Sequence, residues 1–147
     1  MHKEIKEIIS YATNKLGHGS EDADSLIFRT GMAESGYRAL AQNGGPALGF
    51  FQCEPATRDD VLDNYTAYRP NYEDALVDLG FDMDERRLSF ISNIAVQVAF
   101  ARLCYMRVPK KLPKASDLEG QAKYWKTFYN TIKGKGTIEH FMEANGG

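Results

Sequence analysis

One acidic residue of this sequence stands where a proton-transferring side chain is expected. Glu34 is followed by Ser35 and Gly36, and fifteen positions after Glu34 begins a second run, residues 49–57, which reads Gly-Phe-Phe-Gln-Cys-Glu-Pro-Ala-Thr. Glu34 falls in the last turn of a predicted helix, where the negative end of the helix dipole opposes ionisation. Its helical face points toward the two phenylalanines of the run, and desolvation there favours the protonated acid. Such an acid can protonate a leaving oxygen, as glycosidic bond cleavage requires.

The two segments together resemble the catalytic signature of the lysozyme-like lytic transglycosylases of the soluble lytic transglycosylase type. In that family a Glu-Ser pair ends a helix, and a Gly-Leu-Met-Gln-x-x-Pro-x-Thr run follows at the same distance. The glycine, glutamine, proline and threonine stand in register here, at Gly49, Gln52, Pro55 and Thr57, while two aliphatic positions are aromatic. The resemblance implies a lysozyme-like fold in which Glu34 is the catalytic general acid and base.

The same resemblance implies that neighbours of the acid line a substrate cleft. Ser35 and Gln52 would lie beside Glu34, and a side-chain amide offers both donors and acceptors to sugar hydroxyl and acetamido groups. Phe51 is a further substrate-binding candidate because sugar faces pack on aromatic rings. Two alternatives stay open on the residues alone. Gln52 could tie down the backbone of its own loop, and Ser35 could cap the helix end.

A third segment near the C-terminus completes the resemblance. The transglycosylases carry an Ala-Tyr-Asn-Ala-Gly stretch there, and this chain has Phe-Tyr-Asn-Thr at residues 128–131, so the tyrosine and asparagine match and the two small residues do not. Tyr129 and Asn130 are therefore candidates for substrate binding. Tyr129 is the best candidate for a hydroxyl that hydrogen-bonds to the acid or to the reacting sugar. The alternative is a tyrosine in a core stripe with Trp125.

The number of carboxylates distinguishes two reactions on the same substrate. A lysozyme that adds water would use a second carboxylate, for which Glu54, Asp59 and Asp60 are the candidates, although none follows Glu34 at a defensible spacing. The transglycosylases use one acid, and the resemblance implies that the sugar closes its own 1,6-anhydro ring. We expect cleavage of the MurNAc–GlcNAc β-1,4 bond of peptidoglycan. The open alternatives are a hydrolytic lysozyme and a non-catalytic virion or wall-binding structural protein.

Composition excludes several other classes of function. The net charge of −2 indicates no nucleic-acid partner, although residues 86–135 carry eleven lysines and arginines against two acidic residues and could attract an anionic polymer. The three histidines are scattered, so no cluster has metal-ligand spacing, and we expect neither a metal nor a cofactor. Cys53 and Cys104 each lie in an apolar stretch, which favours two free thiols.

The chain length of 147 residues predicts one domain, spanning residues 1–147, and the periodicity predicts a mainly α protein. A broken Gly-rich segment over residues 36–54 should form a loop or a small hairpin beside the cleft. Helices are expected at residues 2–16, 20–35, 55–64, 71–79, 84–106, 117–130 and 137–144.

The expected location follows from the absence of recognisable targeting signals. Charges interrupt the first apolar residues, so no signal peptide is expected, and no apolar run is long enough to span a membrane. The segment from Ala99 to Pro113 and the stretch at residues 125–131 resemble phage-encoded transglycosylases more than exported bacterial ones. The expected partners are peptidoglycan glycan strands and other phage virion proteins. The protein would then reside in a virion or the host cytoplasm and act on the wall from the periplasm.

Overall fold

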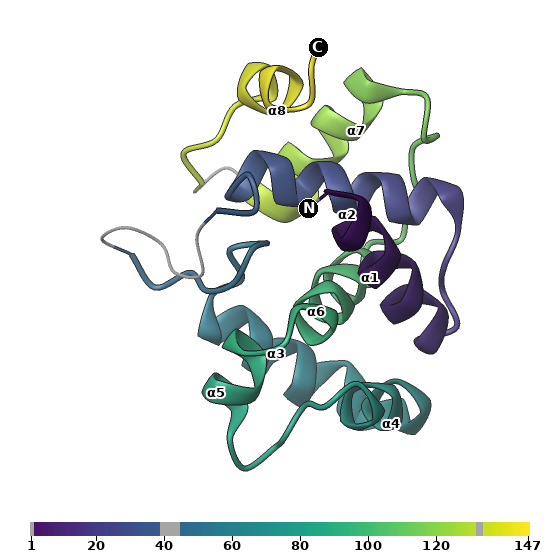
Figure 1. The fold of residues 1–147 in the computed structure, drawn as a ribbon, viewed down its shortest axis with the longest axis vertical. Coiled ribbons are helices and arrows are strands. Elements are labelled where there is room, and N and C mark those ends of the chain that lie inside the picture. Colours follow the sequence, from purple (N-terminus) through teal and green to yellow (C-terminus); the bar gives the residue numbers. More distant parts are fainter. Residues whose placement is uncertain (1, 39–44, 132–133) are drawn as a thin grey trace.

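The computed structural model describes residues 2–38, 45–131 and 134–147, and this part of the chain is mainly α-helical (Figure 1). Two short segments, a 3₁₀ turn at Thr66–Tyr68 and a π-helical turn at Lys126–Asn130, accompany the helices. The described residues form α1 (His2–Lys15), α2 (Glu21–Glu34), α3 (Pro55–Asn64), α4 (Pro70–Asp78), α5 (Arg86–Ile91), α6 (Ile94–Met106), α7 (Leu118–Trp125) and α8 (Ile138–Ala144). None of these helices is long and apolar enough to cross a lipid bilayer.

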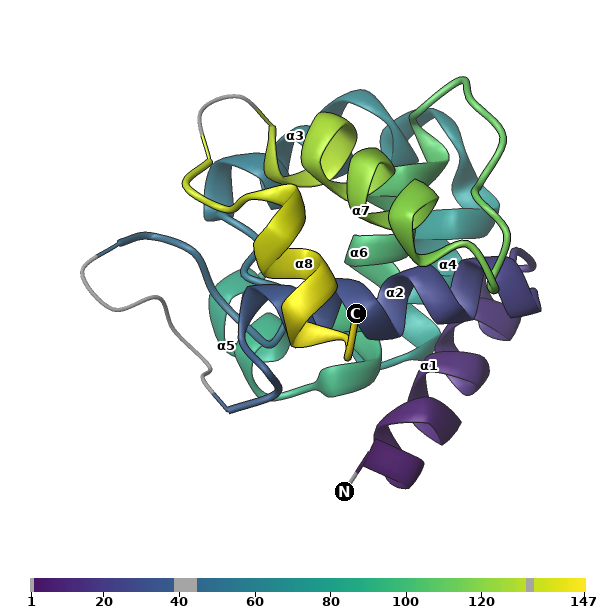
Figure 2. The ribbon, with the colours of Figure 1, turned by 90° about the horizontal axis from the view of Figure 1, so that it is seen from above.

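Helix α6 is the centre of the main hydrophobic core. Its residues Val96, Val98, Ala99, Phe100 and Leu103 are all completely buried. A helix that is apolar around most of its circumference must be covered on several sides. Helices α1, α2, α3 and α5 all pack against α6 (Figures 1 and 2). Helices α7 and α8 instead pack on the other side of α2 and enclose a smaller core around Trp125 and Phe141.

The second helix begins and ends as the sequence predicts. The Ser20 hydroxyl accepts a hydrogen bond from the Ala23 amide at 3.0 Å, which is a typical N-cap contact. At the other end Gly36 has a φ of +62°, a left-handed conformation that glycine adopts without strain. Glu34 is the last residue of α2. The carboxyl group therefore lies beside the point where the chain leaves the helix.

The single helix expected over residues 84–106 is in fact two helices, α5 and α6. Asn93 has an extended backbone, caps α6 by accepting from the Val96 amide at 3.1 Å, and donates to the Leu79 carbonyl at 2.7 Å. Gln97 then satisfies the end of α5, because its amide donates to the carbonyls of Phe90 and Ile91 at 3.0 Å each. Side-chain hydrogen bonds of this kind compete with helix continuation.

This break also changes which residues are buried. Leu88 was expected on the buried face of one continuous helix, yet 63% of its surface is exposed. The change of direction at Asn93 places Leu88 on a short helix whose apolar contact with the core is made by Phe90 instead, which is 1% exposed.

The Gly-rich segment is described only in part. Leu48 and Cys53 pair through two antiparallel backbone hydrogen bonds of 2.9 Å, which close a tight turn over residues 49–52. Gly49 and Gln52 both have positive φ, at +78° and +52°. The remainder of the loop predicted between the two motifs, residues 39–44, lies outside the described residues.

Replacement of Asn93 by alanine tests the helix break. The variant loses the α6 cap and the bond to the Leu79 carbonyl, so the free energy of unfolding should fall by about 1–2 kcal/mol. Urea denaturation measures this change. Asn71→Ala, at an exposed position of α4, is the matched control and should change the stability by less than about 0.5 kcal/mol. Equal losses in the two variants would show that Asn93 does not hold the α5–α6 junction.

Candidate active site

The carboxylate of Glu34 lies between the end of α2 and the second, smaller core. Its Oε2 accepts a hydrogen bond from Nε1 of Trp125 at 2.9 Å. Trp125 is 1% exposed and packs against Phe141 of α8, so the indole that contacts the carboxylate is held rigidly. This hydrogen bond joins the end of α7 to the end of α2 at the candidate site.

Burial dominates the acidity of Glu34. Desolvation raises the pKa of this carboxyl group from its ordinary value of 4.5 to about 7. The hydrogen bond from Trp125, the charge of His140 and a hydrogen bond from the Asn130 side chain all act in the opposite direction, because each stabilises the charged form. Glu34 thus holds a proton near neutral pH and has donors in place that stabilise the carboxylate once the proton leaves. This is the requirement for a general acid that later acts as a base.

Hydrogen bonds connect the tight turn at residues 49–52 to the end of α2 and to the π-helical turn. The Ser35 hydroxyl donates to the Phe50 carbonyl at 2.6 Å, and the Tyr129 hydroxyl donates to the Phe51 carbonyl at 2.7 Å. From α6, the side-chain oxygen Oε1 of Gln97 accepts from the backbone amide of Phe50 at 3.0 Å. The two sequence motifs and the C-terminal segment therefore meet at one place in the fold.

The structure assigns local contacts to several of the predicted substrate-binding side chains. The side-chain amide of Gln52 donates to the Gly49 carbonyl at 2.9 Å. Gln52 therefore holds the backbone of its own loop, which was the alternative to substrate binding. Ser35 both accepts from the Tyr37 amide and donates across to the turn. Phe51 is 1% exposed and packs against Tyr37, so its ring serves the core and has no free face for a sugar in this arrangement.

Tyr129 and Asn130 both lie beside the acid but in different roles. The Tyr129 hydroxyl bonds to the turn and not to Glu34, while its ring stacks on Tyr105 with the centroids 5.2 Å apart. Asn130 is the residue of the matched Tyr-Asn pair whose side chain favours the charged form of Glu34 and so lowers its pKa. The Lys126 ammonium donates to the side-chain oxygen Oδ1 of Asn130 at 2.8 Å, so the side-chain nitrogen of Asn130 remains available as a donor.

A π-helical turn makes these positions possible. Residues 126–130 follow α7 directly with one wider turn, which the Thr131 amide closes by donating to the Lys126 carbonyl at 2.8 Å. Wider turns of this kind often occur at functional sites, because they shift side chains off the regular helical spacing. Gly136 lies so close that an added Cβ would be 2.5 Å from the Trp125 ring. The chain after the π-helical turn therefore folds back over the residues that contact Glu34.

Two site residues could not be found from the sequence motifs. Trp125 was expected only as a core residue, and it is one, but its indole nitrogen also contacts Glu34. His140 was considered only as a scattered histidine. Its Nε2 donates to the Ala33 carbonyl at 2.7 Å, and its charge favours ionisation of the neighbouring Glu34. The only available signal was that the chain has a single tryptophan three positions before the aromatic pair 128–129.

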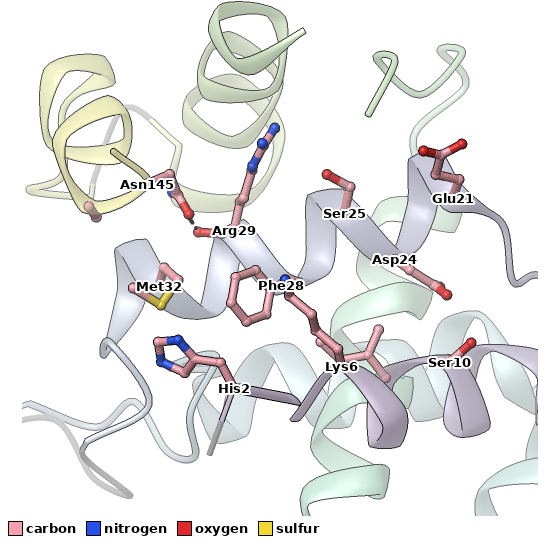
Figure 3. Close-up of a pocket in the computed structure, with 12 residues that line it drawn as sticks. His2, Lys6, Ser10, Glu21, Asp24, Ser25, Phe28, Arg29, Met32 and Asn145 are labelled. Atoms are coloured by element: carbon pink, nitrogen blue, oxygen red, sulfur yellow. Dashed lines mark hydrogen bonds between the residues drawn. The ribbon is translucent and has the colours of Figure 1, made fainter. Parts of the chain in front are cut away.

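Two cavities in the described part of the chain lie elsewhere. A cavity of about 570 Å³ lies between α1, α2 and the end of α8, where Phe28 stands between His2 and Lys6 (Figure 3). A second cavity of about 200 Å³ lies beside α6. Neither cavity includes Glu34. We place the candidate active site at Glu34 because an acid with a raised pKa, the side chains that stabilise its charged form and the tight turn at residues 49–52 come together there. The larger cavity has no such combination.

No group of three or more histidine, cysteine or acidic side chains in the described residues could hold a metal ion. Cys53 and Cys104 are both free thiols, as expected. Comparison with family models, with curated proteins and with solved structures finds no significant match to this chain.

The raised pKa of Glu34 makes a prediction about stability. The unfolded chain releases this proton near pH 4.5 and the folded chain near pH 7, so the stability falls as the pH rises through this interval. Glu34→Gln removes the titration. We therefore compare the free energy of unfolding of this variant with that of the parent protein at two pH values. The difference should favour the variant by about 3 kcal/mol more at pH 8 than at pH 4. Urea denaturation at the two pH values measures the difference.

Glu139→Gln, at an exposed position of α8, is the matched control for this experiment. It should change the stability by less than about 0.5 kcal/mol at either pH. A Glu34→Gln variant with the same relative stability at both pH values would contradict the buried, protonated state of Glu34.

Proposed function

We propose that this protein is a peptidoglycan lytic transglycosylase with a lysozyme-like fold, which cleaves the MurNAc–GlcNAc β-1,4 bond with Glu34 as general acid and base. The observation that carries the proposal is the buried Glu34 carboxyl group, with a pKa of about 7 and a Trp125 donor at 2.9 Å. The motif residues that the resemblance groups together support it, because Ser35, Tyr129 and Asn130 all lie around this carboxyl group or its adjoining turn.

The chemistry would proceed in two proton transfers. Glu34 first donates its proton to the glycosidic oxygen, so that the bond from this oxygen to the anomeric carbon breaks and the leaving sugar departs as an alcohol. The N-acetyl group of the MurNAc residue assists at the anomeric carbon. The Glu34 carboxylate, stabilised by Trp125 and Asn130, then takes the proton of the sugar's 6-hydroxyl. The 6-oxygen attacks the anomeric carbon and closes the 1,6-anhydro ring, and no water is consumed.

The surroundings of Glu34 favour this reaction over hydrolysis. No carboxylate is among the groups that shift the pKa of Glu34. Two of the three candidates for a second acid are already engaged, since Asp59 pairs with Arg86 at 3.1 Å and Asp60 pairs with Arg107 at 2.7 Å. The third, Glu54, is exposed at the start of α3. Residues 39–44 and 132–133, outside the described part, contain no acidic residue.

The proposed biological setting follows from the resemblance. The glycan strands of peptidoglycan are the proposed partner, with other phage virion proteins where the enzyme is carried by a particle. A phage-encoded enzyme would reside in the virion or the host cytoplasm and reach the wall through the periplasm. A non-catalytic wall-binding protein is the less favoured alternative, because binding has no need of an acid that keeps its proton at neutral pH.

Product analysis tests the proposed reaction. Purified peptidoglycan digested with the protein should yield muropeptides with 1,6-anhydro-MurNAc ends, about 18 mass units lighter than hydrolysed ends because no water has been added. Glu34→Gln should lower the rate at least about 10²-fold, while the control Glu54→Gln should leave it nearly unchanged. Reducing ends, together with loss of activity in Glu54→Gln, would instead identify a lysozyme. If Glu34→Gln digested peptidoglycan as fast as the parent protein, Glu34 would have no catalytic role.

The pH profile gives a second test of the role of Glu34. The acid must be protonated at the start of the reaction, so kcat/KM should fall about tenfold per pH unit above a pKa of about 7. Trp125→Phe removes a hydrogen bond that stabilises the carboxylate, so this fall should move to higher pH. A carboxyl ¹³C titration of Glu34 in both proteins checks the same shift without reference to activity. An unmoved profile in Trp125→Phe would mean that the indole does not set the acidity.

A further inference from the structure

The cavity of about 200 Å³ beside α6 is lined by a buried cation that forms no ion pair with an acidic side chain of the described residues. Arg102 extends from α6 into the wall of this cavity and is only 8% exposed. Its one hydrogen bond among the described residues is from Nε to the His18 carbonyl at 3.0 Å. None of the ion pairs in the described part of the chain involves Arg102. Asp24 is the one acid among the groups that favour its charged form, and Asp24 itself accepts a hydrogen bond from the Thr13 hydroxyl at 2.7 Å.

The unpaired nitrogen atoms of Arg102 must face accessible space. A guanidinium has five N–H donors in a fixed planar fork, and the bond to His18 uses only one of them. Every fully buried side-chain nitrogen and oxygen of the described residues has a hydrogen-bond partner. Within residues 2–38, 45–131 and 134–147 the two Nη groups of Arg102 have no acceptor, so they are not fully enclosed, and the cavity is the space that Arg102 lines. A buried charge without a partner is costly unless a bound anion or water accepts its remaining hydrogen bonds.

The rest of the cavity wall matches an anion that carries a short apolar group. Lys110 and His18 line the cavity with Arg102, and no acidic residue does. Burial, and to a lesser extent the charge of Arg102, hold the pKa of His18 below its ordinary value. The remaining wall consists of three tyrosine side chains and of apolar side chains, namely Tyr65, Tyr72, Tyr105, Met106, Val108 and Leu112.

We propose that this cavity is a binding site for a small monocarboxylate, whose oxygens accept from the Nη groups of Arg102 and whose alkyl group lies on the apolar wall. The planar fork of an arginine matches the two oxygens of a carboxylate in a bidentate contact. A volume of about 200 Å³ equals that of about six or seven waters, which suits a ligand of the size of acetate to isobutyrate. The single buried cation and the apolar wall disfavour a doubly charged phosphate. The proposal does not depend on the function of Glu34.

Titration with isobutyrate, followed in ¹H–¹⁵N spectra, tests the site. The Arg102 Nε–H signal and the backbone amides of residues 102–112 should shift saturably, with a dissociation constant of about 1–10 mM, a weak affinity of about 3–4 kcal/mol. Isobutyramide has the same shape without the charge and should give no saturable shift. Inorganic phosphate at equal ionic strength should bind at least about threefold more weakly, because it is more strongly hydrated and has no apolar group.

Three variants locate the binding to this cavity. Arg102→Gln should abolish saturable binding, and Lys110→Gln should weaken it about threefold. Lys123→Gln removes an exposed lysine of α7 that pairs with Glu119 at 3.0 Å, so it is the matched control and should bind as the parent does. Lys110 is exposed, so Lys110→Gln remains informative even if Arg102→Gln does not fold.

Several results would overturn the proposal. These are equal shifts with isobutyrate and isobutyramide, tighter binding of phosphate than of isobutyrate, and equal weakening by Lys110→Gln and Lys123→Gln. Shifts that rise linearly with any sodium salt would show screening of surface charge and not a site.

Discussion

The backbone of one tight turn sets the arrangement of the whole candidate site. A turn enclosed by helices must satisfy its own polar groups, because a buried amide or carbonyl without a partner is costly. Side chains from separate elements do this for residues 49–52. Gln97 of α6 accepts from the Phe50 amide, Ser35 donates to the Phe50 carbonyl, and Tyr129 donates to the Phe51 carbonyl. Each bond fixes an element relative to the turn, and together they bring the end of α2 next to the π-helical turn.

This arrangement holds Glu34 in a balance of opposing effects. Burial next to the Trp125 core favours the neutral acid, while the hydrogen bonds from Trp125 and Asn130 favour the charged form. Burial alone would give an acid that never releases its proton near neutral pH, and exposure would give one that never keeps it. A pKa of about 7 results because desolvation is larger than the sum of the opposing contributions. The cost in stability at neutral pH is typical of functional sites.

The helices that carry the motifs could be predicted from the sequence because their signals are local. Ser20 caps α2, Gly36 ends it, and Asp117 caps α7 by accepting from the Gly120 amide at 2.9 Å, all within a few residues along the chain. The apolar period was misleading over residues 84–106, because it continues through Asn93. The signal for the break was the polar pair Ser92-Asn93, and its effect depends on the distant Leu79 carbonyl.

The contacts within the site were less predictable because they join distant parts of the chain. Glu34 could be proposed from its motif, but its partner Trp125 is 91 positions away and carries no motif of its own. The π-helical turn has no sequence signature, so the regular spacing expected for residues 117–130 could not show that the side chain of Asn130 lowers the pKa of Glu34 while the Tyr129 hydroxyl bonds elsewhere. The role of Tyr129 in holding the Phe51 carbonyl likewise required the position of the turn.

Tyr105 connects the candidate active site with the Arg102 cavity through one hydrogen bond and through ring packing. Its hydroxyl donates to Thr30, one turn before Glu34 in α2, and its ring stacks on Tyr129. Its side chain also lines the cavity that contains Arg102, which lies one turn earlier in α6. Close-packed cores do not deform continuously, so a side chain with such contacts cannot move without displacing one of its partners. Helix α6 therefore does more than fill the core, because Gln97, Arg102 and Tyr105 place both sites on one rigid element.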